Sequence, residues 1–120
     1  TQAAMKKSTL SYLQNLFKSY LYDWTRPYQH FFDQSITSLK LKDYQSRWGS
    51  CSANGELLFN WRLMFAPPAV GRYVAIHECC HLAHMNHSPA FWHLVESLDP
   101  DYRDAKTWLK KFGSYFLAYV

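Results

Sequence analysis

The eleven residues 77–87 read HECCHLAHMNH and include four of the six histidines in a chain of 120 residues. His77 and His81 are four residues apart, so on an α-helix their rings leave the same side one turn apart and can reach one ion. Glu78 lies beside them. This spacing requires a helix at the start of the segment, and it predicts a metal site.

Pro67 and Pro68 favour the first turn of this helix, where a missing N–H is harmless. No helix breaker other than Gly71 follows before Asn86, so we expect the helix to run from about residue 67 to Asn86. Its residues are mostly apolar, which predicts burial on most sides. Unliganded histidines and a free carboxylate would be costly to desolvate there, and this cost favours bound metal over an exposed His-Glu-His cluster.

The pattern His-x-x-x-His with glutamate in the second position is typical of zinc hydrolases. In such sites neutral imidazoles bind the ion, an open coordination position holds water, and a carboxylate that is not a ligand takes the proton of that water. We therefore predict one zinc ion per chain, with His77 and His81 as ligands and Glu78 as the general base.

His87 and His84 are the candidates for a third ligand. His87 lies six residues after His81, roughly 240° around a continuous helix, so the helix must end before His87 can reach the ion. Asn86 tolerates the left-handed conformation that ends helices, and residues 88–89 (Ser-Pro) favour a new helix start. Three histidines on one straight helix would fan too widely for a tetrahedral ion. The spacing thus favours His87, with His84 as a neighbouring or merely packed residue.

Other residues have two interpretations. Tyr73, one turn before His77, could donate its hydroxyl to an oxyanion or simply pack against the sheet. Glu96 could bind the ion or accept a hydrogen bond from an imidazole. Cys51 is expected to be a small core residue, but as a fourth ligand it would close a structural site, and the chain would then be a zinc-stabilised binding module without catalytic activity.

Composition excludes several classes of protein. No apolar run approaches the roughly 18 residues that span a bilayer, and the first residues lack the apolar core of a signal peptide. An odd number of cysteines favours reduced thiols, so we expect a soluble, cytoplasmic protein with no membrane partner. The charge of +4 includes lysines at helical spacing near the end of the chain, a pattern more typical of a solvated helix face than of nucleic-acid binding.

Hydrophobic periodicity and turn signals predict an α+β fold in a single domain. A helical lead-in (1–36), a small sheet (37–64) and the remaining helices (67–120) follow one another. The predicted helices are at about residues 5–24, 28–34, 67–86, 89–97 and 102–116. The predicted strands are at 39–42, 44–48 and 56–61, which should form a sheet of two or three antiparallel strands. A two-residue primed turn at residues 54–55 (Asn-Gly) joins the segment that ends near Ser52 to residues 56–61.

Four runs of residues together resemble the YgjP-like metal-dependent hydrolases, which are related to SprT-like and other minimal zincin metallopeptidases. They are RWGSCS (47–52), NWRLMFAPP (60–68), YVAIHECCHLAHMNHSPAFW (73–92) and LDPDYRDAKTWLK (98–110). The resemblance implies a zincin-like fold, with a small sheet packed on a buried active-site helix and flanking helices. It also implies His77, His81 and His87 as zinc ligands, Glu78 as the catalytic base, and a further N-terminal segment before this one in a longer chain.

The expected activity is hydrolysis of a peptide bond in a polypeptide substrate. The same activated water can attack phosphorus, so a metal-dependent nucleoside triphosphate pyrophosphatase is the main alternative. For a nucleotide substrate, Arg47 and Arg62 could clamp the phosphates while Trp48 or Trp61 stacks on the base, although both arginines could equally form structural ion pairs.

Overall fold

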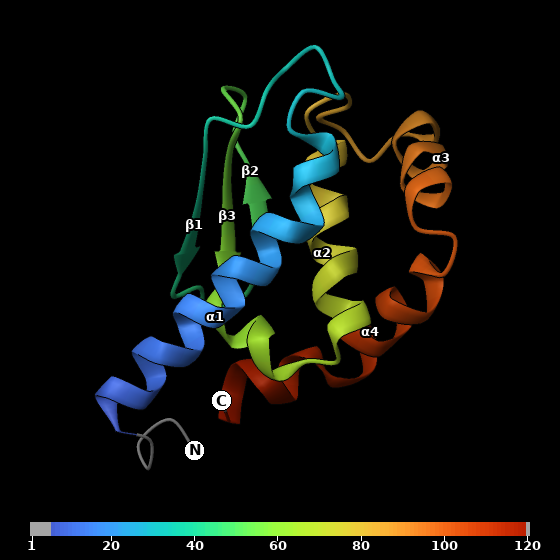
Figure 1. The fold of residues 1–120 in the computed structure, drawn as a ribbon. Coiled ribbons are helices and arrows are strands. Elements are labelled where there is room, and N and C mark those ends of the chain that lie inside the picture. Colours follow the sequence, from blue (N-terminus) through green and yellow to red (C-terminus); the bar gives the residue numbers. More distant parts are fainter. Residues whose placement is uncertain (1–5, 120) are drawn as a thin grey trace.

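Helix α2 (Pro68–Cys80) runs through the middle of the molecule, with the sheet on one side and helices α3 and α4 on the other (Figure 1). The structure is a computed structural model that describes residues 6–119. Its other elements are α1 (Lys7–Thr25), η2 (Arg26–Tyr28), β1 (Ser38–Lys42), β2 (Gly49–Cys51), β3 (Glu56–Asn60), η3 (Trp61–Phe65), α3 (Pro89–Leu98) and α4 (Tyr102–Tyr119). The α+β class is confirmed. Nine of the thirteen α2 residues are buried, as the apolar sequence predicts.

The three strands form a mixed sheet in the order β1–β3–β2, so the prediction of a purely antiparallel sheet is wrong. Strand β3 pairs with β2 in the antiparallel direction and with β1 in parallel. It takes the central position because it is the most apolar strand, and Leu57 and Phe59 are fully buried. The connection from β1 to β2 must therefore pass the end of β3, which places the irregular loop of residues 43–48 at the edge of the sheet.

That loop corrects a second prediction, because residues 44–48 were expected to be a strand and only residues 49–51 pair with β3. The predicted β2–β3 hairpin is confirmed, but its turn differs from the primed type. Gly55 alone has a positive φ, of 86°, whereas a primed turn of that type needs one at Asn54 as well. Ser52 closes the loop instead, since its side-chain oxygen accepts from the Glu56 N–H and its carbonyl accepts from Gly55.

Helix α1 packs across α2 and β1, and it buries Phe17, Leu21 and Thr25. The predicted start near residue 5 lies outside the described residues. Gly71 allows the close crossing with α2, because a Cβ there would meet the Trp24 ring at 3.0 Å. The short helix predicted at residues 28–34 is wrong, since the helical turn covers only Arg26–Tyr28 and residues 29–34 form turns and bends.

Helix α2 ends at Cys80, six residues before the predicted end at Asn86. Its last turn tightens, because the N–H groups of His81, Leu82 and Ala83 each bond to the carbonyl three residues earlier. No described residue other than glycine has a positive φ, so Asn86 does not end the helix in the predicted way. The next helix begins as expected, with Ser88 accepting a hydrogen bond from the Phe91 N–H at 3.3 Å.

Among residues 6–119, no helix is both long and apolar enough to cross a membrane.

Candidate metal centre

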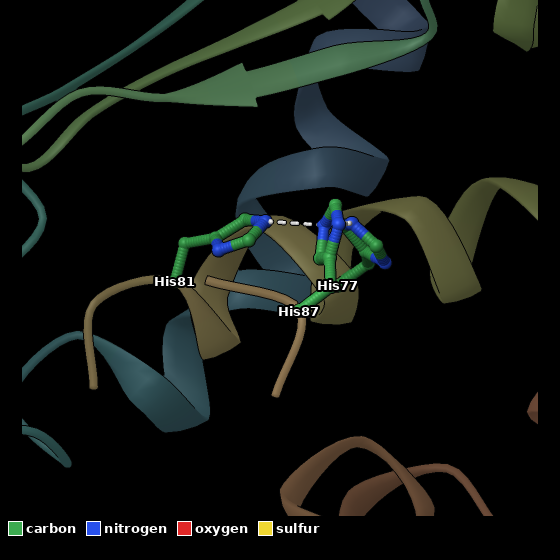
Figure 2. Close-up of side chains that lie close together, drawn as sticks. All are labelled: His77, His81 and His87. Atoms are coloured by element: carbon green, nitrogen blue, oxygen red, sulfur yellow. Dashed lines mark hydrogen bonds between the residues drawn. The ribbon is translucent and has the colours of Figure 1, made fainter. Parts of the chain in front are cut away.

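Three imidazole rings converge at the C-terminal end of α2, where one comes from the helix, one from its C-cap and one from the loop that follows (Figure 2). The Nε2 atom of His87 lies 3.1 Å from Nε2 of His81 and 3.3 Å from Nε2 of His77. Their potential ligand atoms all lie within 4.8 Å of one another, and among residues 6–119 these three form the one group of His, Cys, Asp or Glu side chains that could hold an ion. The early end of α2 is what lets His87 return to the other two rings.

These separations fit a tetrahedral ion. Imidazole nitrogens bound at about 2.0–2.1 Å to tetrahedral zinc lie about 3.3 Å apart. Nitrogen lone pairs at such a distance repel one another unless a proton or a cation lies between them. The donor set therefore fits a divalent ion that prefers nitrogen ligands.

In two of the rings, a hydrogen bond at Nδ1 leaves the Nε2 lone pair free to bind an ion. Nδ1 of His81 lies 2.9 Å from the carbonyl oxygen of His84. A carbonyl can only accept, so Nδ1 carries the proton and Nε2 keeps its lone pair. Nδ1 of His77 likewise lies 3.4 Å from the hydroxyl oxygen of Tyr73, which can accept its proton and leave the Nε2 lone pair free. Thus the backbone of His84, rather than its ring, contacts a ligand histidine.

Burial keeps the helix histidines neutral. It lowers the pKa of His77 to about 3, with further lowering from His81, His87 and Lys106. The pKa of His81 is also lowered by burial, an effect partly opposed by the His84 carbonyl. A neutral imidazole is the form that binds metal, so these two rings could bind an ion near neutral pH without losing a proton first.

The ring of Phe91 packs against all three imidazole rings. It is fully buried in α3, and its ring centroid lies 4.5 Å from His81 and 5.0 Å from both His77 and His87. The Ser88 cap fixes the start of α3, so the same short segment positions both His87 and its support. Nothing in the sequence pattern singles out Phe91, because one apolar residue in an amphipathic helix has no distinguishing mark.

Glu78 lies beside the three histidines and does not belong to their group. Its Oε2 atom is 4.0 Å from Nε2 of His77, and 6% of the residue is exposed. Burial raises the pKa of Glu78 to about 8, while the nearby Arg47 guanidinium lowers it in part. Gly49 of β2 makes room for the carboxylate, because a Cβ at this position would lie 3.0 Å from Glu78 Cγ and 3.2 Å from Oε2.

Two adjoining pockets meet at Glu78, His77 and Gly49. One, of about 300 Å³, is also lined by Arg47, Cys51 and the other two ligand histidines. The other, of about 220 Å³, is also lined by Trp48, Tyr73, Val74 and Leu109. An apolar hollow of about 210 Å³ elsewhere, between α1 and η3, contains none of these groups. The convergent nitrogens therefore face an open cleft.

Several sequence candidates lie away from this cleft. Arg62 is buried in an ion pair with Asp43, and its guanidinium stacks on Trp61, which is itself buried. Glu96 is exposed and pairs with Arg103 at 3.3 Å. Of the two proposed arginines, only Arg47 lines the cleft.

Asn60 is a second residue that sequence reasoning missed. Its fully buried side chain donates to the carbonyls of Tyr44 (3.1 Å) and Arg47 (3.0 Å) and accepts from the Arg62 N–H (3.1 Å). Its own N–H donates to Trp48 at 2.8 Å. These bonds hold loop 43–48 against the cleft. A polar residue at the end of an apolar strand is the available signal, although it does not identify the partners.

Comparisons with known proteins agree with this geometry. The YgjP-like family, described as a YgjP-like metallopeptidase domain, matches residues 1–112. No curated protein and no solved structure matches the chain. A match over nearly the whole length, together with the converging histidines, shows that the chain belongs to the YgjP-like metallopeptidase family.

Proposed function

We propose that this protein is a zinc-dependent hydrolase that cleaves peptide bonds, with the zincin-like site implied by its sequence. One observation carries the proposal: three imidazole Nε2 atoms converge on one point, with the buried carboxylate of Glu78 4.0 Å from one of them. His77, His81 and His87 would hold the ion. Membership of a metallopeptidase family supports the same assignment.

A divalent ion bound there would supply Lewis acidity toward a carbonyl oxygen and make water a stronger acid. Glu78 would take the proton of the attacking water on its carboxylate and then deliver it to the departing amine. Its raised pKa suits both steps, because a group with a pKa near the working pH exchanges protons in either direction. Tyr73 would orient His77 through Nδ1, since its hydroxyl contacts that nitrogen.

The open cleft supports catalysis over a closed structural site. A structural zinc site takes a fourth protein ligand, and among residues 6–119 the group that could hold an ion contains three. Cys51 lies outside this group although it lines the cleft, and burial raises the pKa of its thiol to about 11.

The arrangement favours a peptide over a nucleoside triphosphate. The phosphate clamp inferred from the sequence needs two arginines, and the ion pair with Asp43 holds Arg62 away from the cleft. Trp61 is likewise buried against Phe65 and cannot stack on a base. Arg47 and Trp48 remain beside the cleft, so the nucleotide reaction is a necessary arm of the test.

The test compares zinc-loaded parent protein with Glu78→Gln on unfolded polypeptides and on nucleoside triphosphates. Glu78→Gln should retain zinc and lose about 10²- to 10⁴-fold in peptide hydrolysis, because the ligands remain and the proton acceptor is removed. Glu96→Gln makes the same chemical change outside the cleft and should keep the parent's rate. Release of phosphate or pyrophosphate without peptide cleavage would contradict the proposal, as would equal rates for Glu78→Gln and parent.

A further inference from the structure

Two consecutive residues divide the cleft. Arg47 and Trp48 are the last two residues of loop 43–48, just before Gly49, and their side chains line different pockets. Arg47 lines the pocket that contains His81 and His87, whereas Trp48 lines the pocket that contains Val74 and Leu109. We call these pockets the Arg47 arm and the Trp48 arm. Glu78 and His77 line both, so a chain bound across the cleft would place neighbouring residues in different arms.

The Arg47 arm is polar and has an available cation. Arg47 is exposed, and no ion pair with it is seen among residues 6–119; its guanidinium lies 5.7 Å from the Tyr44 ring centroid. The carboxylate in the lining of this arm is Glu78, which lies at its floor and is more than nine-tenths buried. A bound divalent ion would add positive charge. This arm therefore favours an anionic group over a cationic one.

The Trp48 arm has the opposite character. Apart from the shared His77 and Glu78, its side chains are Trp48, Tyr73, Val74 and Leu109. Its volume of about 220 Å³ leaves room for one large apolar side chain. Burying such a side chain rather than leaving it exposed favours a complex by about tenfold or more, which is enough to select among substrates.

Both arms are built before any substrate binds. The Asn60 amide donates to the carbonyl of Arg47, and the N–H of Asn60 donates to that of Trp48. Helix α4 also packs against Trp48. A Cβ added at Gly113 would lie 3.3 Å from the indole Nε1, so the helix backbone lies close to the ring. A preformed recognition surface costs little ordering entropy on binding, so it contributes to selectivity.

We propose that the cleft selects peptides with an acidic side chain on one side of the cleaved bond and a large apolar side chain on the other. Arg47 binds the carboxylate, and Trp48 with Leu109 encloses the apolar group. This inference rests on the proposed peptidase function and adds the substrate class to it.

The first test uses the zinc-loaded protein and peptides capped at both ends, so that no terminal carboxylate competes. Peptide sets carry Asp, Asn or Lys at each of two positions on either side of the bond. At one position Asp should exceed Asn about fivefold in kcat/KM, since an exposed ion pair contributes up to about 1 kcal/mol. Arg47→Glu should reverse the order to favour Lys. Lys40→Glu makes a similar charge change on β1, at the opposite edge of the sheet, and should keep the parent's order.

The second test varies the other side of the bond through Ala, Leu and Phe. The parent should prefer Leu or Phe to Ala by about tenfold, and Leu109→Trp, which fills the Trp48 arm, should remove that preference. The series on the parent decides the point even where the variant folds poorly. Equal rates for Ala, Leu and Phe would overturn this half of the proposal.

Binding separates this inference from the reaction itself. Dissociation constants of the same peptides for zinc-loaded Glu78→Gln, measured by fluorescence anisotropy, should follow the same charge and size order. Peptide cleavage with no preference for Asp over Asn, or an unchanged order in Arg47→Glu, would overturn the inference and leave the proposed function standing. Turnover of nucleoside triphosphates with neither cleavage nor binding of peptides would remove both.

Discussion

Two irregular loops bring side chains to the cleft, and they are held in different ways. Loop 43–48 is fastened to the sheet by the buried Asn60, by Arg62 and by a 2.9 Å hydrogen bond between Tyr44 and Ser50. Loop 81–88 has its firm contacts at its ends, in the last turn of α2 and at the Ser88 cap. Between them Asn86 and His87 are exposed, and 53% of Met85 is exposed.

Under the proposed function, this difference separates substrate recognition from metal binding. Loop 43–48, which lines both arms of the cleft, keeps its shape through contacts within the protein. Loop 81–88 carries His87, whose ring is positioned by Phe91 and by the other two histidines. We therefore expect the ion to stabilise loop 81–88 and to have little effect on loop 43–48. Four predictions test this contrast, from the largest expected effect to the smallest.

Removing His77 from α2 and removing His87 from loop 81–88 should have similar effects on zinc affinity but different effects on the free energy of unfolding. His77→Ala and His87→Ala should each weaken zinc binding by at least about 100-fold, because even groups that only orient a ligand contribute 10- to 100-fold. In chelator-treated protein, His77→Ala should also lower the free energy of unfolding by about 2 kcal/mol, since this ring is packed against Phe91. His87→Ala should cost under about 0.5 kcal/mol because His87 is exposed. Competition with a zinc chelator and urea unfolding measure the two quantities; equal stability losses would contradict the contrast.

Glu78, at the floor between the loops, should make the stability of chelator-treated protein depend on pH. Burial raises its pKa from 4.5 to about 8, so the folded protein retains a proton that the unfolded chain releases between these values. The stabilising contribution is complete below about pH 4.5 and is lost as the pH rises through 8. The stability of Glu78→Gln relative to the parent should rise by up to about 5 kcal/mol from pH 4.5 to 8.5, because each unit of pKa difference corresponds to about 1.4 kcal/mol.

Urea titrations of the two proteins at several pH values measure this difference. His77, whose lowered pKa makes stability fall as the pH drops below about 6.5, is present in both proteins, so its effect cancels. A pH-independent difference would show that Glu78 is not desolvated in the folded chain.

Breaking the anchor of loop 43–48 should lower stability without removing metal. Asn60→Ala removes the amide donor from the carbonyls of Tyr44 and Arg47, and Tyr44 keeps only the 3.4 Å hydrogen bond from Arg62, so the change should cost about 1–3 kcal/mol in the free energy of unfolding. Asn15→Ala, on the exposed face of α1, should change it by less than about 0.5 kcal/mol. Zinc affinity should stay within about twofold of the parent. A large loss of zinc affinity would show that the two loops depend on each other.

Chelation should act on one loop only. Removing zinc should speed limited proteolysis within loop 81–88 by about three- to tenfold, because the ion no longer holds His87 to α2. Cleavage within loop 43–48 should keep its rate, since its anchors do not involve the ligands. Mass spectrometry of early fragments locates the cuts, and equal acceleration in both loops would count against a separate role for the ion.

Local sequence signals predicted the helices of the second half of the chain well. Ser88 and Pro89 set the start of α3, and the apolar run from Val70 to Leu82 indicated a buried helix, because capping and burial depend on near neighbours. The four-residue spacing of His77 and His81 likewise predicted that both rings face the same point, because it depends only on local helix geometry. The end of α2 was placed six residues too late, since the tightened last turn depends on packing that no local signal records.

The sheet was predicted less well than the helices, because its arrangement depends on contacts between distant residues. Alternation at Leu39 and Leu41 predicted a strand, but strand direction depends on which neighbour occupies the centre, and this is a non-local choice. The extended segment predicted at residues 44–48 became a loop because β3 lies between β1 and β2 and the chain must pass around it. Arg62 and Arg47 looked equivalent in the sequence, although one is buried against Asp43 and the other faces the cleft.

The sequence by itself placed His77 and His81 on one side of a helix with Glu78 beside them, because a four-residue spacing on a helix has one geometric meaning. It also determined the family. Only the tertiary structure decided that Gly49 makes room for Glu78, that Phe91 supports the three rings, and that Asn60 holds Arg47 and Trp48 at the cleft. Those contacts join residues far apart in the chain, and their energies depend on the complete packing around them rather than on any local pattern.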